Sequence, residues 1–257
     1  MSLVITVFNQ KGGVGKSTTV INLSSALALR GKKTLIVDMD PQGNATSGLG
    51  LYEFGNMIYD FLIDEEEDSI YPTGFSKLDI IPSNSEFAGV EIELATHKDW
   101  QFKLKKMIDR VKDNYDFVII DSPPSLGILS MMSLVASDKI LVPVQCEYYA
   151  LEGVTQLMDT MTLVRENFNP DLSLLGVVMC MFDGRTNLSN QVVEEIQKHF
   201  DNKVFKTFIP RNVRLAEAPS YGMNIYDYDS SSKGAKAYSD LAKEVIGEIN
   251  DLSLIHI

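Results

Sequence analysis

The feature that most constrains this chain is the glycine-rich stretch of residues 9–18, which reads NQKGGVGKST. A short apolar run, residues 3–8, precedes it, and an apolar-periodic stretch, residues 20–29, follows it. A strand, a glycine-rich loop and a helix in this order are what a phosphate-binding loop requires. Glycine lets the loop turn its backbone N–H groups inward, and the helix N-terminus completes a concave anion site. The sequence therefore predicts a phosphate-binding site at this loop.

Two lysines make the motif more specific. Lys16 is placed to reach the outer phosphates of a nucleotide, and the Ser17 hydroxyl to hold Mg²⁺. The general pattern needs glycine at position 10, where this chain has Gln10, and a second lysine, Lys11, begins the loop instead. The form K-G-G-x-G-K-[ST] resembles the deviant Walker A loop of the ParA/MinD group of P-loop ATPases. The alternative, a glycine-rich turn with surface lysines, does not explain the flanking strand and helix.

This resemblance implies ATP and Mg²⁺ as cofactors. It also implies a homodimer that closes around ATP, in which Lys11 crosses to the phosphates of the partner subunit. Both Lys11 and Lys16 are then catalytic. The nucleotide-binding residues implied in the loop are Lys11, Gly12, Gly13, Val14, Gly15, Lys16, Ser17 and Thr18.

Short β-branched runs alternate with helical patterns along the chain. The predicted strands cover residues 3–8, 34–37, 78–81, 117–120, 139–142, 174–181 and 204–209. The predicted helices cover residues 17–29, 57–63, 87–94, 100–112, 126–135, 151–167, 188–199 and 234–250. Most strands are continuous apolar runs, as in parallel sheets covered on both faces. We therefore expect an α/β fold, with a doubly wound, mostly parallel sheet and helices on both faces.

One domain is expected over residues 1–250. Residues 251–257 (DLSLIHI) match no motif and are expected to be a tail, either disordered or left over from cloning.

Two carboxylates follow the predicted strand 34–37, in the stretch Asp38-Met-Asp40-Pro-Gln-Gly-Asn. Ligands gather at the carboxyl ends of parallel strands, so this position suits ion binding and water activation. The alternative is a loop whose aspartates only cap turns. The stretch resembles switch I of the ParA family. That resemblance implies that Asp40 positions or activates the attacking water and is catalytic, and that Asp38 supports the Mg²⁺ site.

A third carboxylate, Asp121, ends the apolar run 117–120 and precedes Ser-Pro-Pro-Ser-Leu-Gly. An aspartate at the end of a buried strand is a Walker B element, which holds Mg²⁺, usually through water. The signal is weak alone and stronger with a phosphate-binding loop ahead of it. The string IDSPPSLG resembles the family's Walker B and switch II. The implied metal residues are then Ser17, Asp38 and Asp121.

The distribution of charge limits where nucleic acid could bind. The net charge is −12, but residues 184–243 carry nine Lys or Arg against seven Asp or Glu. Any such contact must come from a local patch in this part of the chain. The segments MFDGR and IPRNVRLAEAPS resemble those of Soj-like ParA proteins. This implies that Pro210 and Asn212 border the adenine and that Arg185 and Arg214 contact DNA. The alternative is that these arginines form ordinary surface ion pairs.

The resemblance covers residues 2 to about 247. It implies a weak ATPase that dimerises with ATP, binds DNA without sequence preference and partitions chromosome or plasmid DNA. A ParB-like partner would stimulate turnover. No apolar run approaches the ~18 residues of a membrane span, and the N-terminus is no signal peptide. A cytoplasmic, nucleoid-associated protein without a membrane partner is expected.

Three other functions are compatible with a P-loop ATPase of this type. A MinD-like membrane-associated positioning ATPase relies on a basic amphipathic C-terminal helix, which the end KEVIGEINDLSLIHI does not provide. An electron-transfer ATPase similar to the nitrogenase iron protein needs cysteines beside the switch loops, and Cys146 and Cys180 are misplaced for that role. A ParA-like ATPase that positions a protein cargo stays open.

Overall fold

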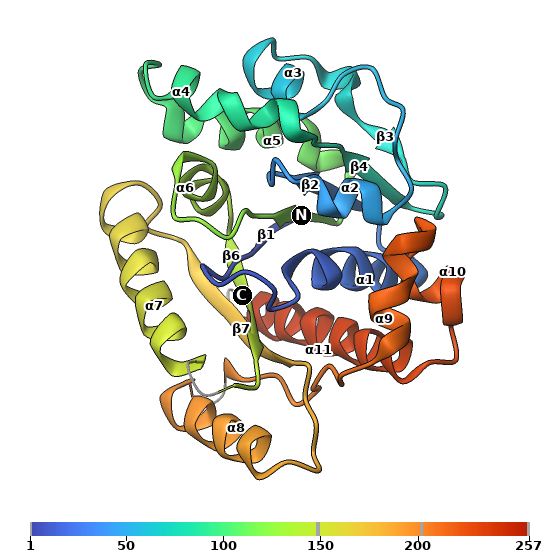
Figure 1. Ribbon diagram of the computed structural model, residues 1–257. Helices are drawn as coiled ribbons and strands as arrows, with labels where there is room; N and C mark the ends of the chain where they lie inside the picture. The colour runs from blue at the N-terminus through green and yellow to red at the C-terminus, as the bar shows by residue number, and fades with distance from the viewer. Residues whose placement is uncertain (1, 148–149, 201–202, 256–257) are drawn as a thin grey trace.

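The computed structural model describes residues 2–147, 150–200 and 203–255. Strands in these ranges form one sheet in the order β3-β4-β2-β5-β1-β6-β7 (Figure 1). The strands are β1 Leu3–Val7, β2 Thr34–Asp38, β3 Tyr71–Pro72, β4 Leu78–Ile81, β5 Phe117–Asp121, β6 Lys139–Gln145 and β7 Ser173–Cys180. Neighbouring strands are parallel except β3, which runs antiparallel to β4 at one edge. The mostly parallel sheet is therefore confirmed.

Helices cover both faces of the sheet, which confirms the doubly wound α/β fold. The helices are α1 Lys16–Leu29, α2 Asn44–Gly48, α3 Ile58–Ile63, α4 Val90–Leu94, α5 Lys103–Val111, α6 Ile128–Val135, α7 Ala150–Asn167, α8 Asn187–Phe200, α9 Val213–Glu217, α10 Ile225–Asp229 and α11 Lys233–Ile255. One face packs against α1 and α11, and the opposite face against α3 to α8. No helix in the described ranges is long and apolar enough to cross a membrane.

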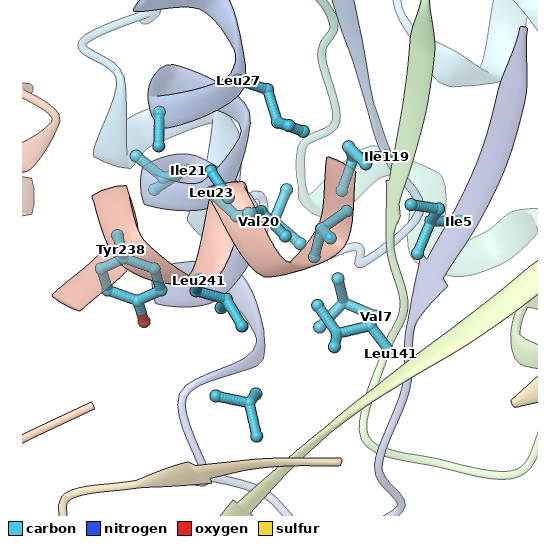
Figure 2. Close-up of a cluster of buried hydrophobic side chains, with 14 of the residues drawn as sticks. Ile5, Val7, Val20, Ile21, Leu23, Leu27, Ile119, Leu141, Tyr238 and Leu241 are labelled. Atoms are coloured by element: carbon cyan, nitrogen blue, oxygen red, sulfur yellow. The ribbon is translucent and has the colours of Figure 1, made fainter. Parts of the chain in front are cut away.

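The alternation of side chains along each strand creates the two cores. Figure 2 shows the core beneath α1 and α11, where Val7 of β1 and Leu141 of β6 approach Leu241 of α11. Ile5 of β1 and Ile119 of β5 also pack in this core, whereas their sequence neighbours Val4 and Val118 pack on the other face, in the cluster that includes α5 and α6. Since both faces are buried, both sets of positions must be apolar, which explains the continuous apolar runs.

The sheet register aligns the ends of the central strands. Val7 of β1 is paired with Asp121 of β5, and Asp121 with Asp38 of β2. The three loops that follow these strands therefore leave the sheet side by side, at its carboxyl edge. In an open parallel sheet this edge is where ligands bind.

The predicted strand 204–209 is wrong as a continuous strand. This segment runs beside β7 but forms only isolated bridges, Val177 with Val204 and Phe182 with Pro210. The amides of Lys206 and Thr207 donate instead to the Glu244 carboxylate of α11, each at 2.8 Å. Because these two amides do not donate to β7, the hydrogen-bond ladder between this segment and β7 is interrupted between the two bridges.

Among the described residues, four short strands or α-helices were not predicted, namely β3, α2, α9 and α10. Each is five residues or shorter, which gives too little apolar periodicity to detect. Side chains supply the start signals for two of them: Asn212 accepts from the amide of Arg214 to begin α9, and Asn224 accepts from Tyr226 to begin α10. The last helix also continues through Ile255, over residues expected to form a tail, whereas residues 256 and 257 lie outside the described ranges.

Candidate active site

The glycine-rich loop joins β1 to α1 and borders a cavity of about 450 Å³. Gly13 and Gly15 have φ angles of 74° and 97°, which only glycine adopts readily, and Gly15 caps α1. A Cβ at Gly12 or Gly13 would meet nothing within 4 Å, so the loop is open on the cavity side. The cavity is lined by Gly12, Gly13, Gly15, Lys16, Ser17, Thr18, Ile21, Asp40, Gln42, Asn44, Ser47, Gly48, Pro124, Met181 and Pro219.

Lys16 is a desolvated cation at the floor of this cavity. Its residue exposure is only 7%, and its Nζ donates to the Lys11 carbonyl at 2.9 Å. Burial lowers the pKa of Lys16, while the charges of Asp121 and Asp40 act in the opposite direction. A buried ammonium group is stabilised by an anion, so a phosphate beside Lys16 would relieve the cost of its burial.

Lys11 points in a different direction from Lys16. Its ammonium group forms an ion pair with Glu147, which follows the end of β6. The Asn9 side chain fixes the loop at this point, since it accepts from the Lys11 amide at 3.0 Å and donates to the Pro143 carbonyl at 2.8 Å. Sequence reasoning gave Glu147 no role, and no local pattern could have paired it with a residue 136 positions away.

The carboxylate of Asp121 is fully buried. Neither oxygen has a hydrogen-bond partner of good geometry among the described residues. Burial, followed by the charge of Asp38, raises the pKa of Asp121 well above its usual value, whereas the nearby Ser17 hydroxyl acts in the opposite direction. A buried carboxylate of this kind needs a cation or a proton.

Asp38 has the opposite surroundings, although it is equally buried. Its Oδ2 accepts from the Thr46 amide at 3.0 Å and from the Thr46 hydroxyl at 2.7 Å, and its Oδ1 accepts from the Asp40 amide at 3.2 Å. Burial raises the pKa of Asp38 to about 6, and these hydrogen bonds limit the rise. Asp38 therefore organises the loop that follows β2.

Asp40 is the carboxylate of this loop that reaches the cavity. It is 6% exposed, and its Oδ1 accepts from the Gln42 amide at 2.9 Å. One oxygen is thus used to shape the turn, and the side chain stays at the cavity wall. This placement suits a residue that orients a water molecule.

The donor set fits a magnesium ion that arrives with a nucleotide. Within the described ranges, no three or more His, Cys, Asp or Glu side chains are grouped to hold a metal by themselves. Mg²⁺ is usually held by one or two carboxylates together with substrate phosphates and water. The partnerless oxygens of Asp121, with Ser17 close by, match that requirement.

A second, more apolar cavity of about 210 Å³ adjoins the first and shares Gly15, Thr18 and Met181 with it. It contains the predicted residues Pro210 and Asn212. Cys180, Met181 and Tyr238 also line it, and sequence reasoning missed this contribution because the three residues come from β7, its following loop and α11. A flat apolar group attached to the phosphates fits this arrangement.

The two predicted DNA contacts are exposed but already ion-paired. The Arg185 side chain is 89% exposed and donates to both oxygens of Asp183, at 2.9 and 2.7 Å. This interaction lowers the pKa of Asp183 to about 2. Arg214 pairs with Glu217 at 3.0 Å and lies 3.6 Å from Asp229. Both arginines therefore present less net charge than the sequence alone suggested.

Comparison with known proteins gives consistent matches along the chain. The family described as an AAA domain matches residues 2–174. The chain is 53% identical over 249 residues to the sporulation initiation inhibitor protein Soj of Bacillus subtilis, covering 95% of this chain and 98% of that protein. It is 45% identical over 247 residues to the chromosome partitioning protein ParA of Myxococcus xanthus, with coverages of 95% and 87%. Among solved structures, cobyrinic acid a,c-diamide synthase from Mycobacterium smegmatis with bound ADP and magnesium has a TM-score of 0.83 and 34% identity, with coverages of 95% and 93%.

Proposed function

The chain belongs to the ParA/Soj family of chromosome-partitioning ATPases, and from this premise we propose that it uses ATP binding and hydrolysis to move chromosome or plasmid DNA. The observation that carries the proposal is the alignment of the glycine-rich loop, Asp38 and Asp121 at one edge of the sheet. A cavity of about 450 Å³ at this edge holds Lys16 and Asp40 together.

ATP binds with its phosphates over the glycine-rich loop and its base toward Pro210 and Asn212. The loop amides and Lys16 hold the phosphates, since a helix N-terminus and a desolvated cation both favour an anion. Ser17 and Asp121 are the residues that would hold Mg²⁺, with Asp38 supporting the adjoining loop. Bound Mg²⁺ neutralises charge on the phosphates. Asp40 orients the water that attacks the terminal phosphate.

ATP also brings two subunits together. Facing triphosphates repel each other unless cations lie between them, and Lys11 of each subunit supplies that charge. Lys11 must first leave Glu147, which favours the monomer without nucleotide. We expect weak intrinsic turnover that a ParB-like partner stimulates.

The dimer binds DNA through phosphates and associates with the nucleoid. Arg185 and Arg214 from both subunits supply the contacts, and neither is placed on a long helix that could read base edges. A monomer offers half of these contacts, so binding should require ATP. Because Asp183 and Glu217 already neutralise part of the charge, a single subunit should bind especially weakly.

The test is fluorescence anisotropy on two unrelated duplexes, across a salt series, with and without ATP. Binding should require ATP, ignore sequence and fall with a log–log salt slope of about −0.9 per phosphate neutralised. Arg185→Ala and Arg214→Ala should each weaken binding to both duplexes and flatten the slope without changing ATP-dependent dimerisation. Wild-type affinity in the double variant, or tight binding without nucleotide, would instead favour a ParA-like ATPase that positions a protein cargo.

A further inference from the structure

The hydroxyl group of Thr46 has two hydrogen-bond partners from separate parts of the sheet edge. Thr46 lies in α2 and is only 2% exposed. Its Oγ1 donates to Asp38 Oδ2 at 2.7 Å and accepts from the Ser83 amide at 2.9 Å. Asp38 ends β2, and Ser83 lies two residues beyond the end of β4. One buried hydroxyl therefore joins α2 to the ends of two neighbouring strands.

This arrangement reaches Asp40 through Asp38. The Thr46 amide and hydroxyl both donate to Asp38 Oδ2, so this oxygen cannot move without breaking two hydrogen bonds. The other oxygen of Asp38 accepts from the Asp40 amide. The orientation of Asp38 thus sets where the backbone of Asp40 lies, and Asp40 lies at the wall of the large cavity.

A close backbone contact reinforces the same geometry. Gly43, which precedes α2, has a φ of 60°, and a Cβ at this position would lie 2.6 Å from the Ser83 carbonyl oxygen. The amide of Gly43 also donates to the Asp40 carbonyl at 2.8 Å. The loop from Asp40 to Thr46 is therefore held against the segment after β4 at Gly43 and at Thr46.

We propose that Thr46 is a positioning residue for hydrolysis, whose hydroxyl fixes Asp38 and thereby holds Asp40 at the cavity wall. This inference rests on the proposed role of Asp40 in orienting water. It also gives Asp38 the task of positioning Asp40 and not of binding the metal, because an oxygen that already accepts two hydrogen bonds is poorly placed to hold a metal. Asp121 is left as the carboxylate that would hold the metal, since neither of its oxygens has a hydrogen-bond partner of good geometry among the described residues.

A positioning role and a merely structural role predict different kinetics. If Thr46 only stabilised the fold, its loss would lower stability and leave turnover of the folded protein unchanged. If it positions Asp40, ATP should still bind, because the glycine-rich loop and Lys16 are intact, whereas turnover at saturating ATP should fall.

The decisive variant is Thr46→Val, which keeps the shape of the side chain and removes the hydroxyl. Turnover should fall about tenfold or more, as expected for loss of a buried hydrogen bond to a charged group, while ATP affinity stays within about twofold. Thr46→Ser keeps the hydroxyl and should restore most of the turnover. If Thr46→Val does not fold, Thr46→Cys replaces the hydroxyl by a weak donor of similar size, and its turnover should lie well below that of Thr46→Ser.

Thr34→Val is the matched control. Thr34 is also fully buried, lies at the other end of β2 and donates its hydroxyl to the Lys32 carbonyl at 3.1 Å. The same chemical change is made there at the start of the strand that Asp38 ends, away from Asp40, so turnover should match the wild type. Amide hydrogen exchange supplies a readout independent of activity: the Ser83 amide should exchange faster in Thr46→Val and unchanged in Thr34→Val.

Asp40→Ala distinguishes a failure of the inference about Thr46 from a failure of the proposed role of Asp40. If Asp40→Ala abolishes hydrolysis but Thr46→Val turns over at the wild-type rate, the inference about Thr46 is overturned and the proposed function stands. Equal losses of turnover in Thr46→Val and Thr46→Ser would also overturn it, since the hydroxyl would then be irrelevant. Normal hydrolysis in Asp40→Ala would overturn the proposed role of Asp40 itself.

Discussion

Replacement of Gly43 by alanine should strongly destabilise the loop that carries Asp40. Gly43 has a φ of 60°, and its added Cβ would lie 2.6 Å from the carbonyl oxygen and 3.3 Å from the carbonyl carbon of Ser83. Both are backbone atoms that follow a buried strand, so they cannot rotate away as a side chain would. Either the loop or the segment after β4 must shift.

The cost has two parts of known size. A left-handed conformation costs a non-glycine residue about 1–2 kcal/mol. Overpacking of a well-packed site costs about 1–3 kcal/mol more. The expected loss of unfolding free energy is therefore about 2–5 kcal/mol, a large part of the ~5–15 kcal/mol typical of a folded protein.

Gly74→Ala isolates the cost of the left-handed conformation from the cost of overpacking. Gly74 has a φ of 81°, but a Cβ there would meet nothing within 4 Å. Only the conformational cost of about 1–2 kcal/mol applies to this variant. Urea unfolding of the two variants and the wild type gives the comparison, and the hydrolysis rate of folded Gly43→Ala should fall because Asp40 moves with its loop. If both variants lose equal stability within about 0.5 kcal/mol, the approach of Gly43 to Ser83 does not constrain the loop.

Further predictions concern the interface, the DNA contacts and the thiols. With ATP, Asp40→Ala should accumulate as a dimer by light scattering, whereas the double variant Lys11→Ala, Asp40→Ala should stay monomeric; a dimeric double variant would contradict the crossing role of Lys11. Asp183→Asn should strengthen ATP-dependent DNA binding a few-fold in anisotropy, because the carboxylate that pairs with Arg185 loses its charge, and unchanged or weaker binding would count against Arg185 as a contact. Burial raises the pKa of Cys146 to about 11, so its thiolate fraction at pH 8 is about one in a thousand. Labelling of the native protein by a maleimide, followed by mass spectrometry, should therefore be slow at pH 7. The labelling rate should rise about tenfold per pH unit up to pH 10. Rapid labelling at pH 7 would contradict the raised pKa of the Cys146 thiol.

The sequence by itself identified the phosphate-binding loop, because everything that the loop needs is local. The glycines that adopt left-handed conformations, the lysine of the first helical turn and the flanking strand and helix lie within residues 3–29. The carboxylates Asp38 and Asp121 were found for a related reason. Each ends a buried apolar strand, and parallel strands bring their carboxyl ends to one edge whatever the order of the strands.

The surroundings of each carboxylate were decided by tertiary structure. Asp38 and Asp121 look alike in sequence, since both end an apolar strand. Only the fold places the Thr46 amide and hydroxyl against Asp38 and leaves Asp121 without a partner among the described residues. Hydrogen bonding in a buried site depends on which donors come within about 3 Å, and sequence spacing does not specify that.

Long-range packing also explains the other differences between the sequence-based predictions and the structure. The segment 204–209 has the composition of a strand, but the Glu244 carboxylate of α11 captures two of its amides and interrupts the ladder. The sequence predicts contacts for Arg214 and Lys11, but their partners in the structure, Glu217 and Glu147, became apparent only in three dimensions. Periodicity and motifs fix local geometry and the class of fold. The pairing of charges depends on long-range packing, so it emerges only once the chain is folded.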